Sequence, residues 1–221
     1  MRSCGRMTEM APIRVVLADD HTLVRRGIVA ILASPSIDVA GEAEDGRSLL
    51  CVVRRTRPDI ALIDLSMPLL NGIEATRRIL RISPETRVII VSMHADRDAM
   101  RRAKRAGARG YVLKDAAPER LLEAVRAVAR GEESFPVDLA PTETDTGTEQ
   151  VLTSREREVL QLIVEGKRNK EIAEIMTRSV HTIRNHRARI MRKLGVRSAT
   201  GLVPAAERLG IVRPASGMEV R

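Results

Sequence analysis

The sequence contains no apolar run that approaches the ~20 residues needed for a membrane-spanning helix. The first residues, MRSCGRMTEMAP, also lack the apolar core of a secretion signal, so we expect a cytoplasmic protein without a membrane partner. Cysteine is scarce as well, because Cys4 and Cys51 are the only two and neither belongs to a CxxC pair. This pattern favours reduced thiols over a disulfide.

Lysine is also rare: 5 of the 38 basic residues are lysine and the other 33 are arginine. A net charge of +9 suggests a nucleic-acid partner, although genome composition alone can produce an arginine bias. The distribution of charge is more informative than the total. Residues 1–131 have a net charge of +7, residues 132–150 of −6 and residues 151–221 of +8. The last third carries a similar positive excess on about half the length, which favours a nucleic-acid-binding module there.

The acidic segment EESFPVDLAPTETDTGTEQ, residues 132–150, is rich in proline, threonine and carboxylates and has little to bury. Such a composition is typical of a flexible linker between domains. A chain of 221 residues with 43% hydrophobic residues is long enough for two cores. We therefore expect a disordered N-terminal extension at 1–11, domains at 12–131 and 151–215 on either side of the linker, and a tail at 216–221.

The first domain alternates the patterns of buried strands and amphipathic helices. Strands separated by helices indicate a parallel sheet that is covered on both faces. The prediction is an α/β doubly wound fold with a five-stranded parallel sheet. Strands are predicted at 13–17, 37–43, 60–64, 87–92 and 110–114, and helices at 21–33, 47–55, 72–81 (capped by Asn71), 96–106 and 118–131.

Polar side chains stand where several of these strands end. Asp19 and Asp20 follow the first strand, Asp64 ends the third, Ser92 the fourth and Lys114 the fifth. In a doubly wound fold, ligands bind outside the carboxyl ends of the strands, so these side chains should converge. Three carboxylates repel one another unless a cation joins them. Their oxygen ligands favour magnesium, which keeps waters and accepts phosphate oxygens.

The same residues suit phosphoryl transfer. Asp64 is placed to attack phosphorus as a nucleophile and to form an acyl phosphate. Lys114 and magnesium would stabilise charge on the phosphoryl oxygens, and the Ser92 hydroxyl would donate a hydrogen bond to one of them. Each residue also has an ordinary explanation by itself, since aspartates often cap helices and tyrosines are commonly part of a core. We expect His21 and His94 to be surface residues without a metal role.

The stretches ADDH, IDLSMPLLNG, VIIVSMH and GARGYVLKD resemble the receiver domain of bacterial two-component response regulators over residues 13–130. The resemblance implies that Asp64 is the phospho-acceptor and that a sensor histidine kinase supplies the phosphoryl group. It also implies a site for Mg²⁺ or Mn²⁺, a switch pair and a phosphate-binding lysine. The residues in these roles would be Asp19, Asp20, Asp64 and the backbone carbonyl of Ser66 for the metal, Ser92 and Tyr111 for the switch, and Lys114 for the phosphate.

The second domain has the pattern of a helix-turn-helix. Its apolar stripes predict helices at about 154–165, 170–176 and 180–194. A tight turn between the last two helices is the defining feature of that motif. The expected caps and stops are, in chain order, Thr153 with Glu156, then Gly166, Asn169, Ser179 and Gly195.

The outward face of the third predicted helix is basic and nearly free of acid. Arginine, asparagine and histidine suit the major groove, where arginine pairs with guanine and asparagine with adenine. An ordinary solvated basic helix is the simpler alternative, but the preceding EIAEIMTRS places this helix in a helix-turn-helix. The expected DNA contacts are His181, Thr182, Arg184, Asn185, Arg187, Ala188, Arg189, Arg192 and, on the second helix, Lys170.

This region resembles the DNA-binding domain of LuxR-type regulators in LTSREREVLQLI, GKRNKEIA, TIRNH and KLGV, over residues 152–212. A receiver followed by such an all-α, four-helix domain is the arrangement of the NarL/FixJ family of transcription factors. The resemblance implies binding to double-stranded promoter DNA, a homodimer when phosphorylated, and RNA polymerase as a candidate further partner. Ala188 departs from the family, because it cannot make a polar contact. Gly201 and Pro204 interrupt the final helix, which should be kinked or start only at Pro204.

We expect the unphosphorylated receiver to mask the recognition helix. Phosphorylation of Asp64 would draw Ser92 inward, let Tyr111 follow, and release the DNA-binding domain for dimerisation. Two alternatives remain: a regulator that binds DNA without phosphorylation, and an aspartyl-phosphate phosphatase-like enzyme. Such phosphatases usually carry a DxD motif after the first strand, whereas the aspartates here are adjacent and the nucleophile is on the third strand. We therefore expect no enzyme activity beyond assistance to the receiver's own phosphotransfer and dephosphorylation.

Overall fold

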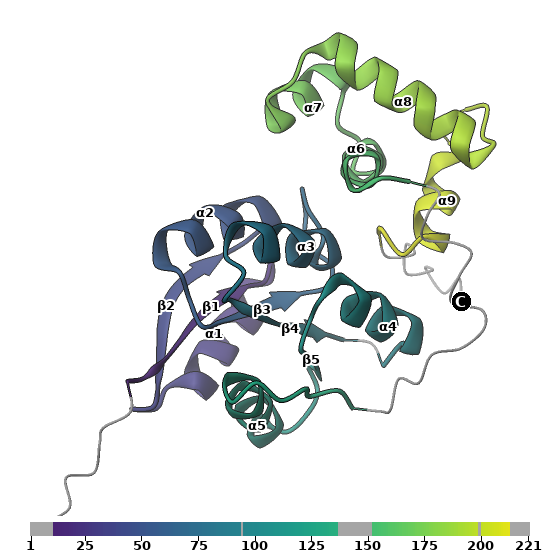
Figure 1. The fold of residues 1–221 in the computed structure, drawn as a ribbon. Helices are drawn as coiled ribbons and strands as arrows, with labels where there is room; N and C mark the ends of the chain where they lie inside the picture. The colour runs from purple at the N-terminus through teal and green to yellow at the C-terminus, as the bar shows by residue number, and fades with distance from the viewer. Residues whose placement is uncertain (1–10, 94, 137–151, 199, 213–221) are drawn as a thin grey trace, which may run out of the picture.

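The structure is a computed structural model that describes residues 11–93, 95–136, 152–198 and 200–212 of the 221-residue chain. The expected tail, most of the expected linker and nearly all of the expected N-terminal extension lie outside the described residues, as does His94. The chain forms an N-terminal α/β part and a C-terminal helical part (Figure 1). No described helix has the length and apolar character that crossing a membrane requires.

The N-terminal part alternates strands and helices as predicted. The predicted bounds of its second, third and fourth strands are those of the structure. The fifth strand ends just before Lys114, which therefore lies at the edge of the sheet. The elements are β1 (Ile13–Ala18), α1 (Thr22–Leu32), β2 (Ile37–Ala43), α2 (Gly46–Thr56), β3 (Ile60–Asp64), α3 (Gly72–Ile82), β4 (Arg87–Ser92), α4 (Arg97–Ala106), β5 (Gly110–Leu113) and α5 (Pro118–Ala129).

All five strands of the described sheet run parallel, in the order β2-β1-β3-β4-β5. Successive side chains of a strand point to opposite faces of the sheet, and here they belong alternately to two apolar clusters. Helices cover both of these apolar faces (Figure 1). Ile63 belongs to the cluster that contains Leu49 of α2 and Met100 of α4, whereas Leu62 belongs to the one that contains Val125 of α5. The predicted doubly wound fold is confirmed, and its strand order puts the ends of β1 and β3 side by side.

The segment Leu65–Asn71, which we call the β3–α3 loop, packs directly against the end of β3. A Cβ atom on Gly72, the first residue of α3, would lie 2.5 Å from the carbonyl oxygen of Asp64, so a larger residue would collide with the backbone. Asn71 caps α3 as predicted and accepts a hydrogen bond from the Glu74 amide at 3.0 Å. Both ends of the loop are therefore held close to Asp64.

The C-terminal part is helical and contains α6 (Ser154–Val164), α7 (Asn169–Met176), α8 (Val180–Leu194) and α9 (Leu202–Arg208). The capping box of Thr153 and Glu156 starts α6, and Ser179 caps α8, both as predicted. Buried residues from all four described helices form one apolar cluster. The predicted four-helix domain with a helix-turn-helix, α7 and α8, is confirmed.

Two helix starts in this part differ from the predictions. α7 begins at Asn169, whereas the prediction made Asn169 the cap before the helix. The N-cap is instead Arg168, whose amide donates to the Glu171 carboxylate at 2.7 Å. α9 begins at Leu202, not at Pro204. Pro204 lies in the first turn, where a backbone N–H has no partner within the helix in any case, and Gly201 precedes the helix as its N-cap. The residues expected to interrupt the helix therefore mark its start.

The first residues of the expected linker are packed against the N-terminal part. Ser134 forms a parallel bridge with Gly110 and accepts a hydrogen bond from the Tyr111 amide at 2.8 Å. Glu133 pairs with Lys104 at 2.7 Å. The packed structure of the N-terminal part thus includes Glu133 and Ser134, the second and third residues of the acidic segment.

Candidate functional site

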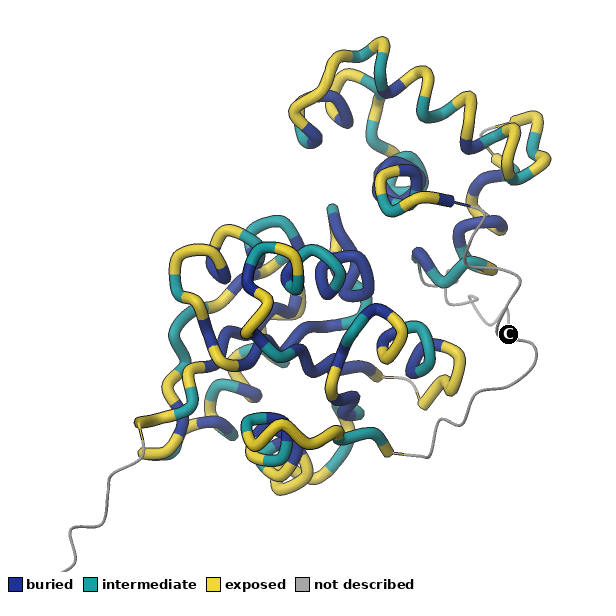
Figure 2. The backbone as a smooth tube through the Cα atoms, viewed as in Figure 1, coloured by how far each residue is buried: buried dark blue, intermediate teal, exposed yellow. Residues whose placement is uncertain are grey.

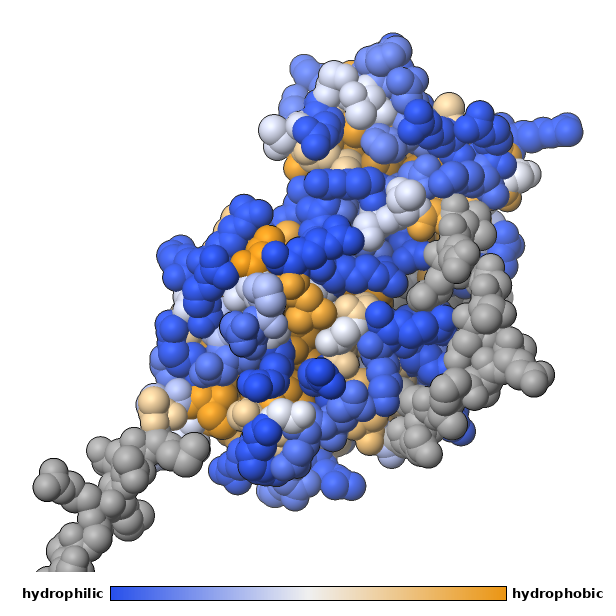
Figure 3. Space-filling model, viewed as in Figure 1, coloured by the Kyte–Doolittle hydropathy of each residue, from blue (hydrophilic) through white to orange (hydrophobic). Residues whose placement is uncertain are grey.

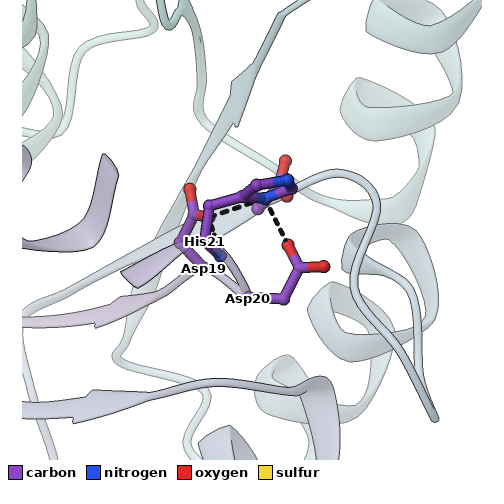
Figure 4. Close-up of side chains that lie close together, drawn as sticks. Asp19, Asp20 and His21 are labelled. Atoms are coloured by element: carbon purple, nitrogen blue, oxygen red, sulfur yellow. Dashed lines mark hydrogen bonds and ion pairs between the residues drawn. The ribbon is translucent and has the colours of Figure 1, made fainter. Parts of the chain in front are cut away.

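An acidic cluster lies at the carboxyl end of the sheet. One ligand atom from each of Asp19, Asp20, His21 and Asp64 lies within 4.8 Å of the others. Asp19 and Asp64 are buried, whereas Asp20 and His21 are exposed. Figure 4 shows Asp19, Asp20 and His21 grouped at the end of β1, with the imidazole linked to both carboxylates. The structure thus brings together the three carboxylates predicted from the strand ends.

Lys114 joins the two buried carboxylates of this cluster. Its Nζ lies 2.6 Å from Asp19 Oδ2 and 3.2 Å from Asp64 Oδ2, and its side chain is almost fully buried. Burial raises the pKa of Asp64, the Lys114 ammonium opposes that shift, and the negative charge of Asp19 reinforces it. One ammonium faces two buried carboxylates, so the site has a local excess of negative charge.

The donors in this cluster fit a hard divalent cation. Asp64 Oδ1 is buried and has no hydrogen-bond partner among the described residues. Carboxylate oxygens are the preferred ligands of Mg²⁺, and the exposure of Asp20 leaves one side of the site open to water. A cation here would offset the negative charge that Lys114 leaves. Ser66, whose carbonyl is the fourth predicted ligand, is half-buried in the β3–α3 loop, two residues after Asp64.

Ser92 and Tyr111 are buried neighbours on adjacent strands. Burial raises the pKa of Tyr111, and a hydrogen bond between its hydroxyl and that of Ser92 opposes this shift. Tyr111, which is predicted to follow Ser92 inward on phosphorylation, is 1% exposed in the structure. Its ring belongs to the apolar cluster that includes Met100 and Ala103 of α4, and this packing explains the buried position.

His21 is a contact that sequence reasoning misses. Its side chain is 57% exposed, which agrees with the predicted surface position. Its Nδ1, however, lies 2.8 Å from Asp20 Oδ1 and 3.5 Å from Asp19 Oδ1. The one signal in the sequence is its place directly after the aspartate pair. In this position the imidazole faces the open side of the cluster.

The predicted DNA-binding face lies on the outer side of α8. Figure 2 shows this helix as a mixture of exposed and half-buried residues with few buried ones. Asn185 Nδ2 lies 3.2 Å from His181 Nε2, which links two of the predicted contact residues. Ser179 caps the helix by accepting the Thr182 amide at 3.1 Å. Of the predicted contacts, the exposed ones are Lys170, His181, Arg184, Asn185, Ala188, Arg189 and Arg192, and the half-buried ones are Thr182 and Arg187.

The prediction that the receiver masks this helix is wrong for the structure described here. The N-terminal part contacts α6, the Ile175 carbonyl of α7 and the Ile211 carbonyl after α9, and α8 lies on the far side of α6 (Figure 1). Charge explains the choice. The receiver presents Arg47 and Arg78 at this surface, and these would repel the arginines of α8. α6 instead offers an acceptor, Glu158, which binds both of them.

Glu158 is the centre of the contact between the two parts. Its side chain is fully buried and pairs with Arg78 of α3, with Arg47 of α2 at 3.5 Å, and with Arg155 of its own helix at 3.3 Å. Burial raises the pKa of Glu158, and the three guanidinium groups oppose that shift. Figure 3 shows hydrophilic residues across the seam between the two parts. The sequence alone did not distinguish Glu158 from a solvated helix residue.

Comparison with known proteins agrees with both parts of the chain. Residues 15–126 match the family described as response regulator receiver domain, and residues 150–206 match the family described as bacterial regulatory proteins, luxR family. The chain belongs to the LuxR-type response regulators. This regulator is a DNA-binding protein of a two-component system, and its family is one of transcriptional regulators rather than enzymes.

Relatives match nearly the whole regulator. It is 39% identical over 213 residues to the uncharacterised transcriptional regulatory protein YxjL of Bacillus subtilis, covering 91% of this chain and 98% of that protein. It is 38% identical to the oxygen regulatory protein NreC of Staphylococcus aureus, covering 88% of this chain and 96% of NreC. A two-domain match therefore extends across the linker.

Solved structures match either nearly the whole chain or its larger part. The regulator is 29% identical to RcsB of Salmonella typhimurium, with a TM-score of 0.61 over 90% of this chain and 99% of that chain. An RcsB–DNA complex also matches, at 29% identity and a TM-score of 0.55, over 88% of this chain and 98% of that chain. A LuxR-family response regulator from Aurantimonas sp. matches at 37% identity and a TM-score of 0.55, over 59% of this chain and 94% of that chain.

Proposed function

We propose that this regulator accepts a phosphoryl group on Asp64 from a sensor histidine kinase and thereby controls its binding to promoter DNA. The observation that carries the proposal is the pairing of two buried carboxylates, Asp19 and Asp64, with a single buried ammonium, Lys114. A site with this charge excess is suited to a divalent cation and to the anion that the cation attracts. A bound Mg²⁺ or Mn²⁺ would supply charge neutralisation for the phosphoryl oxygens.

The chain's own residues have distinct parts in the reaction. An Asp64 carboxylate oxygen attacks the phosphorus of the kinase phosphohistidine, the P–N bond breaks, and its electron pair returns to the imidazole. Lys114 holds Asp64 in place beforehand and then faces the transferred phosphoryl group. The Ser92 hydroxyl donates to a phosphoryl oxygen. Asp19, Asp20, Asp64 and the Ser66 carbonyl would hold the metal.

For DNA, we propose that α8 enters the major groove with Arg184 and Asn185 facing the bases. Both side chains are exposed on the outer face of the helix. Arg187, Arg189, Arg192 and Lys170 would contact phosphates, so affinity should fall with salt. Phosphorylation would favour a homodimer on paired half-sites, with RNA polymerase as a candidate partner at the promoter.

A second candidate function follows from the exposure of α8. Because the receiver leaves the outer face of this helix uncovered, the regulator is also suited to DNA binding without phosphorylation. The two candidates differ in one quantity, the ratio of DNA affinities before and after phosphorylation. A ratio of one supports constitutive binding, and a higher affinity after phosphorylation supports control by the receiver.

The test of the phosphorylation site is intact-mass measurement after incubation with acetyl phosphate and Mg²⁺. The wild-type chain should gain the mass of one phosphoryl group, and the gain should disappear when Mg²⁺ is chelated. Asp64→Asn is the matched control, because it keeps the size of the side chain and removes the nucleophilic charge. An equal yield of adduct in Asp64→Asn would show that another residue is the acceptor.

A further inference from the structure

The DNA-binding domain holds the backbone of the β3–α3 loop, which directly follows Asp64. Gln161 of α6 donates from Nε2 to the Met67 carbonyl at 2.9 Å and accepts the Asn71 amide on Oε1, also at 2.9 Å. Glu165, the C-cap residue directly after α6, accepts the Leu69 amide at 3.1 Å. Three backbone groups of one receiver loop are thus bound by two side chains of the other domain.

Leu69 is the residue of the loop with the least favourable backbone conformation. Its φ is +64°, in the left-handed region that costs a residue with a side chain free energy. Its side chain is partly buried against the apolar cluster of the DNA-binding domain. Within the loop, the Leu70 amide donates to the Pro68 carbonyl at 2.7 Å and closes a tight turn around Leu69. Burial of the Leu69 side chain and the hydrogen bond to Glu165 add two contacts from the DNA-binding domain. The docked domain therefore reinforces a turn that the loop also closes with its own backbone.

The contacts of Gln161 are buried and would be costly to lose. Gln161 is 2% exposed and Asn71 is 5% exposed. Gln161 also donates to Glu165 Oε1 at 2.8 Å, and Asn71 Nδ2 donates to the Ile211 carbonyl at 3.2 Å. A buried polar group without a hydrogen-bond partner destabilises the folded state. These bonds therefore form or break together with domain docking.

The loop connects these contacts to the phosphorylation site over a very short distance. The carbonyl of Met67 directly follows that of Ser66, the proposed metal ligand. At the other end, the Gly72 amide donates to the Leu65 carbonyl at 2.9 Å, and Gly72 has no room beside the Asp64 carbonyl for even a Cβ atom. A loop held at Met67, Leu69 and Asn71 has little freedom to rearrange around a phosphoryl group on Asp64.

We propose that Gln161 and Leu69 couple domain docking to phosphorylation in both directions: α6 restrains the β3–α3 loop, docking slows phosphorylation of Asp64, and phosphorylation weakens docking. The inference rests on the proposed function and adds the residues that carry the coupling. Linkage requires the effect to be reciprocal, so a substitution that frees the loop from α6 makes the unphosphorylated receiver easier to phosphorylate. Gln161 is a positioning residue in this scheme and does not touch the phosphoryl group.

The experiment compares full-length wild type with Gln161→Ala and Leu69→Ala. Amide hydrogen exchange reports on the loop without any chemistry at Asp64, and small-angle X-ray scattering reports on domain separation. Both variants should exchange the amides of residues 65–71 faster and have a larger radius of gyration. Their initial rates of phosphorylation by acetyl phosphate with Mg²⁺ should rise about fivefold or more, the lower end of typical coupling.

Two controls separate this result from general destabilisation. Leu122→Ala removes a half-buried leucine of α5 that packs in the receiver and lies away from α6. It should leave loop exchange, scattering and phosphorylation rate unchanged. Glu158→Ala should separate the domains without altering any side chain that contacts the loop, and it should therefore also speed phosphorylation.

The outcomes distinguish the coupling from the function on which it rests. Opened variants that are phosphorylated at the wild-type rate would overturn the coupling while leaving Asp64 as acceptor. Unchanged loop exchange in Gln161→Ala and Leu69→Ala would also overturn it, because α6 would then not restrain the loop. A wild-type chain that accepts no phosphoryl group would overturn the proposed function first, and the coupling with it.

Discussion

Two of the regions in which this regulator buries carboxylates have opposite balances of charge. At the end of the sheet, Asp19 and Asp64 share the ammonium of Lys114. At the contact between domains, the single carboxylate of Glu158 faces the guanidinium groups of Arg47, Arg78 and Arg155.

The difference indicates what each region needs from outside the chain. The site around Asp64 has too little positive charge of its own, so a cation and a phosphoryl group complete it. The contact around Glu158 has more than enough positive charge and needs no added ion. The first arrangement is suited to ligand binding, and the second to holding two domains of the chain together.

The largest expected effect comes from removing the one ammonium of the first region. Lys114→Met leaves Asp19 and Asp64 buried without their shared partner and removes a charge that stabilises the transferred phosphoryl group. The phosphorylation rate should fall by about 10²–10³-fold, as for the loss of one stabilising donor. Intact-mass time courses with acetyl phosphate measure it. A rate within twofold to threefold of wild type, by the same scale, would mean that Lys114 is structural only.

Removing the carboxylate of the second region should undo domain docking. Glu158→Ala removes the carboxylate that Arg47 and Arg78 share and leaves Arg47 with its bond to the Ile175 carbonyl, and breaking a buried pair in this way typically costs about 3–5 kcal/mol. We expect the lower end, since both arginines are partly exposed. The radius of gyration from scattering should rise. Arg155→Ala is the control, because that arginine is half exposed and should contribute under about 1 kcal/mol.

Metal addition should stabilise the first region and not the second. Because burial raises the pKa of Asp64, this carboxyl keeps its proton to higher pH in the folded state than in the unfolded state. The free energy of unfolding therefore falls as pH rises through the pKa of Asp64 in the folded state, where this carboxyl ionises. Binding of Mg²⁺ to the ionised carboxylate should reverse this loss. At a hundredfold excess over Kd, Mg²⁺ should add about 2.7 kcal/mol.

The measurement is thermal unfolding with and without Mg²⁺, in mildly acidic and in neutral buffer. The increase in Tm caused by Mg²⁺ should be larger in neutral buffer, where the proton competes less for Asp64. Glu158→Gln should retain the same Mg²⁺ response. An increase of equal size at both pH values would contradict the role assigned to the Asp64 proton.

The smallest expected effects are on DNA contacts, which neither buried region includes. Arg184→Ala should weaken binding to a specific duplex by about 1–3 kcal/mol if the side chain reads a base edge. Lys170→Ala should weaken specific and non-specific binding alike and reduce the salt slope by about one. Fluorescence anisotropy titrations at several salt concentrations separate the two. Equal losses on specific and random duplexes for Arg184→Ala would reassign it to a phosphate contact.

Much of the first region could be predicted from the sequence, because its chemistry is tied to strand ends. The bounds of β3 and β4 follow from continuous apolar runs, and topology alone then brings Asp19, Asp64 and Lys114 to one edge. The caps at Asn71 and Ser179 follow from local hydrogen bonding in the same way. These features depend on neighbours in the chain or on a regular sheet.

The second region could not be predicted, because it depends on how two domains meet. Glu158 and Gln161 read as polar positions of a surface helix, and nothing local indicates that both are buried. The contacts that Leu69 makes with the apolar cluster of the other domain and with Glu165 likewise depend on docking. The predicted masking of α8 was wrong for the same reason, since a basic helix and an acidic linker do not determine which helix the receiver contacts.

The most direct test of the central claim is the affinity of the full chain for DNA before and after phosphorylation. A duplex selected by the protein from a random pool serves as the ligand, and Asp64→Asn treated with acetyl phosphate and Mg²⁺ serves as the control. The account predicts that phosphorylated wild type binds about 5–150-fold more tightly than unmodified wild type, while Asp64→Asn does not change. Equal affinities for the two forms of the wild-type chain would contradict it.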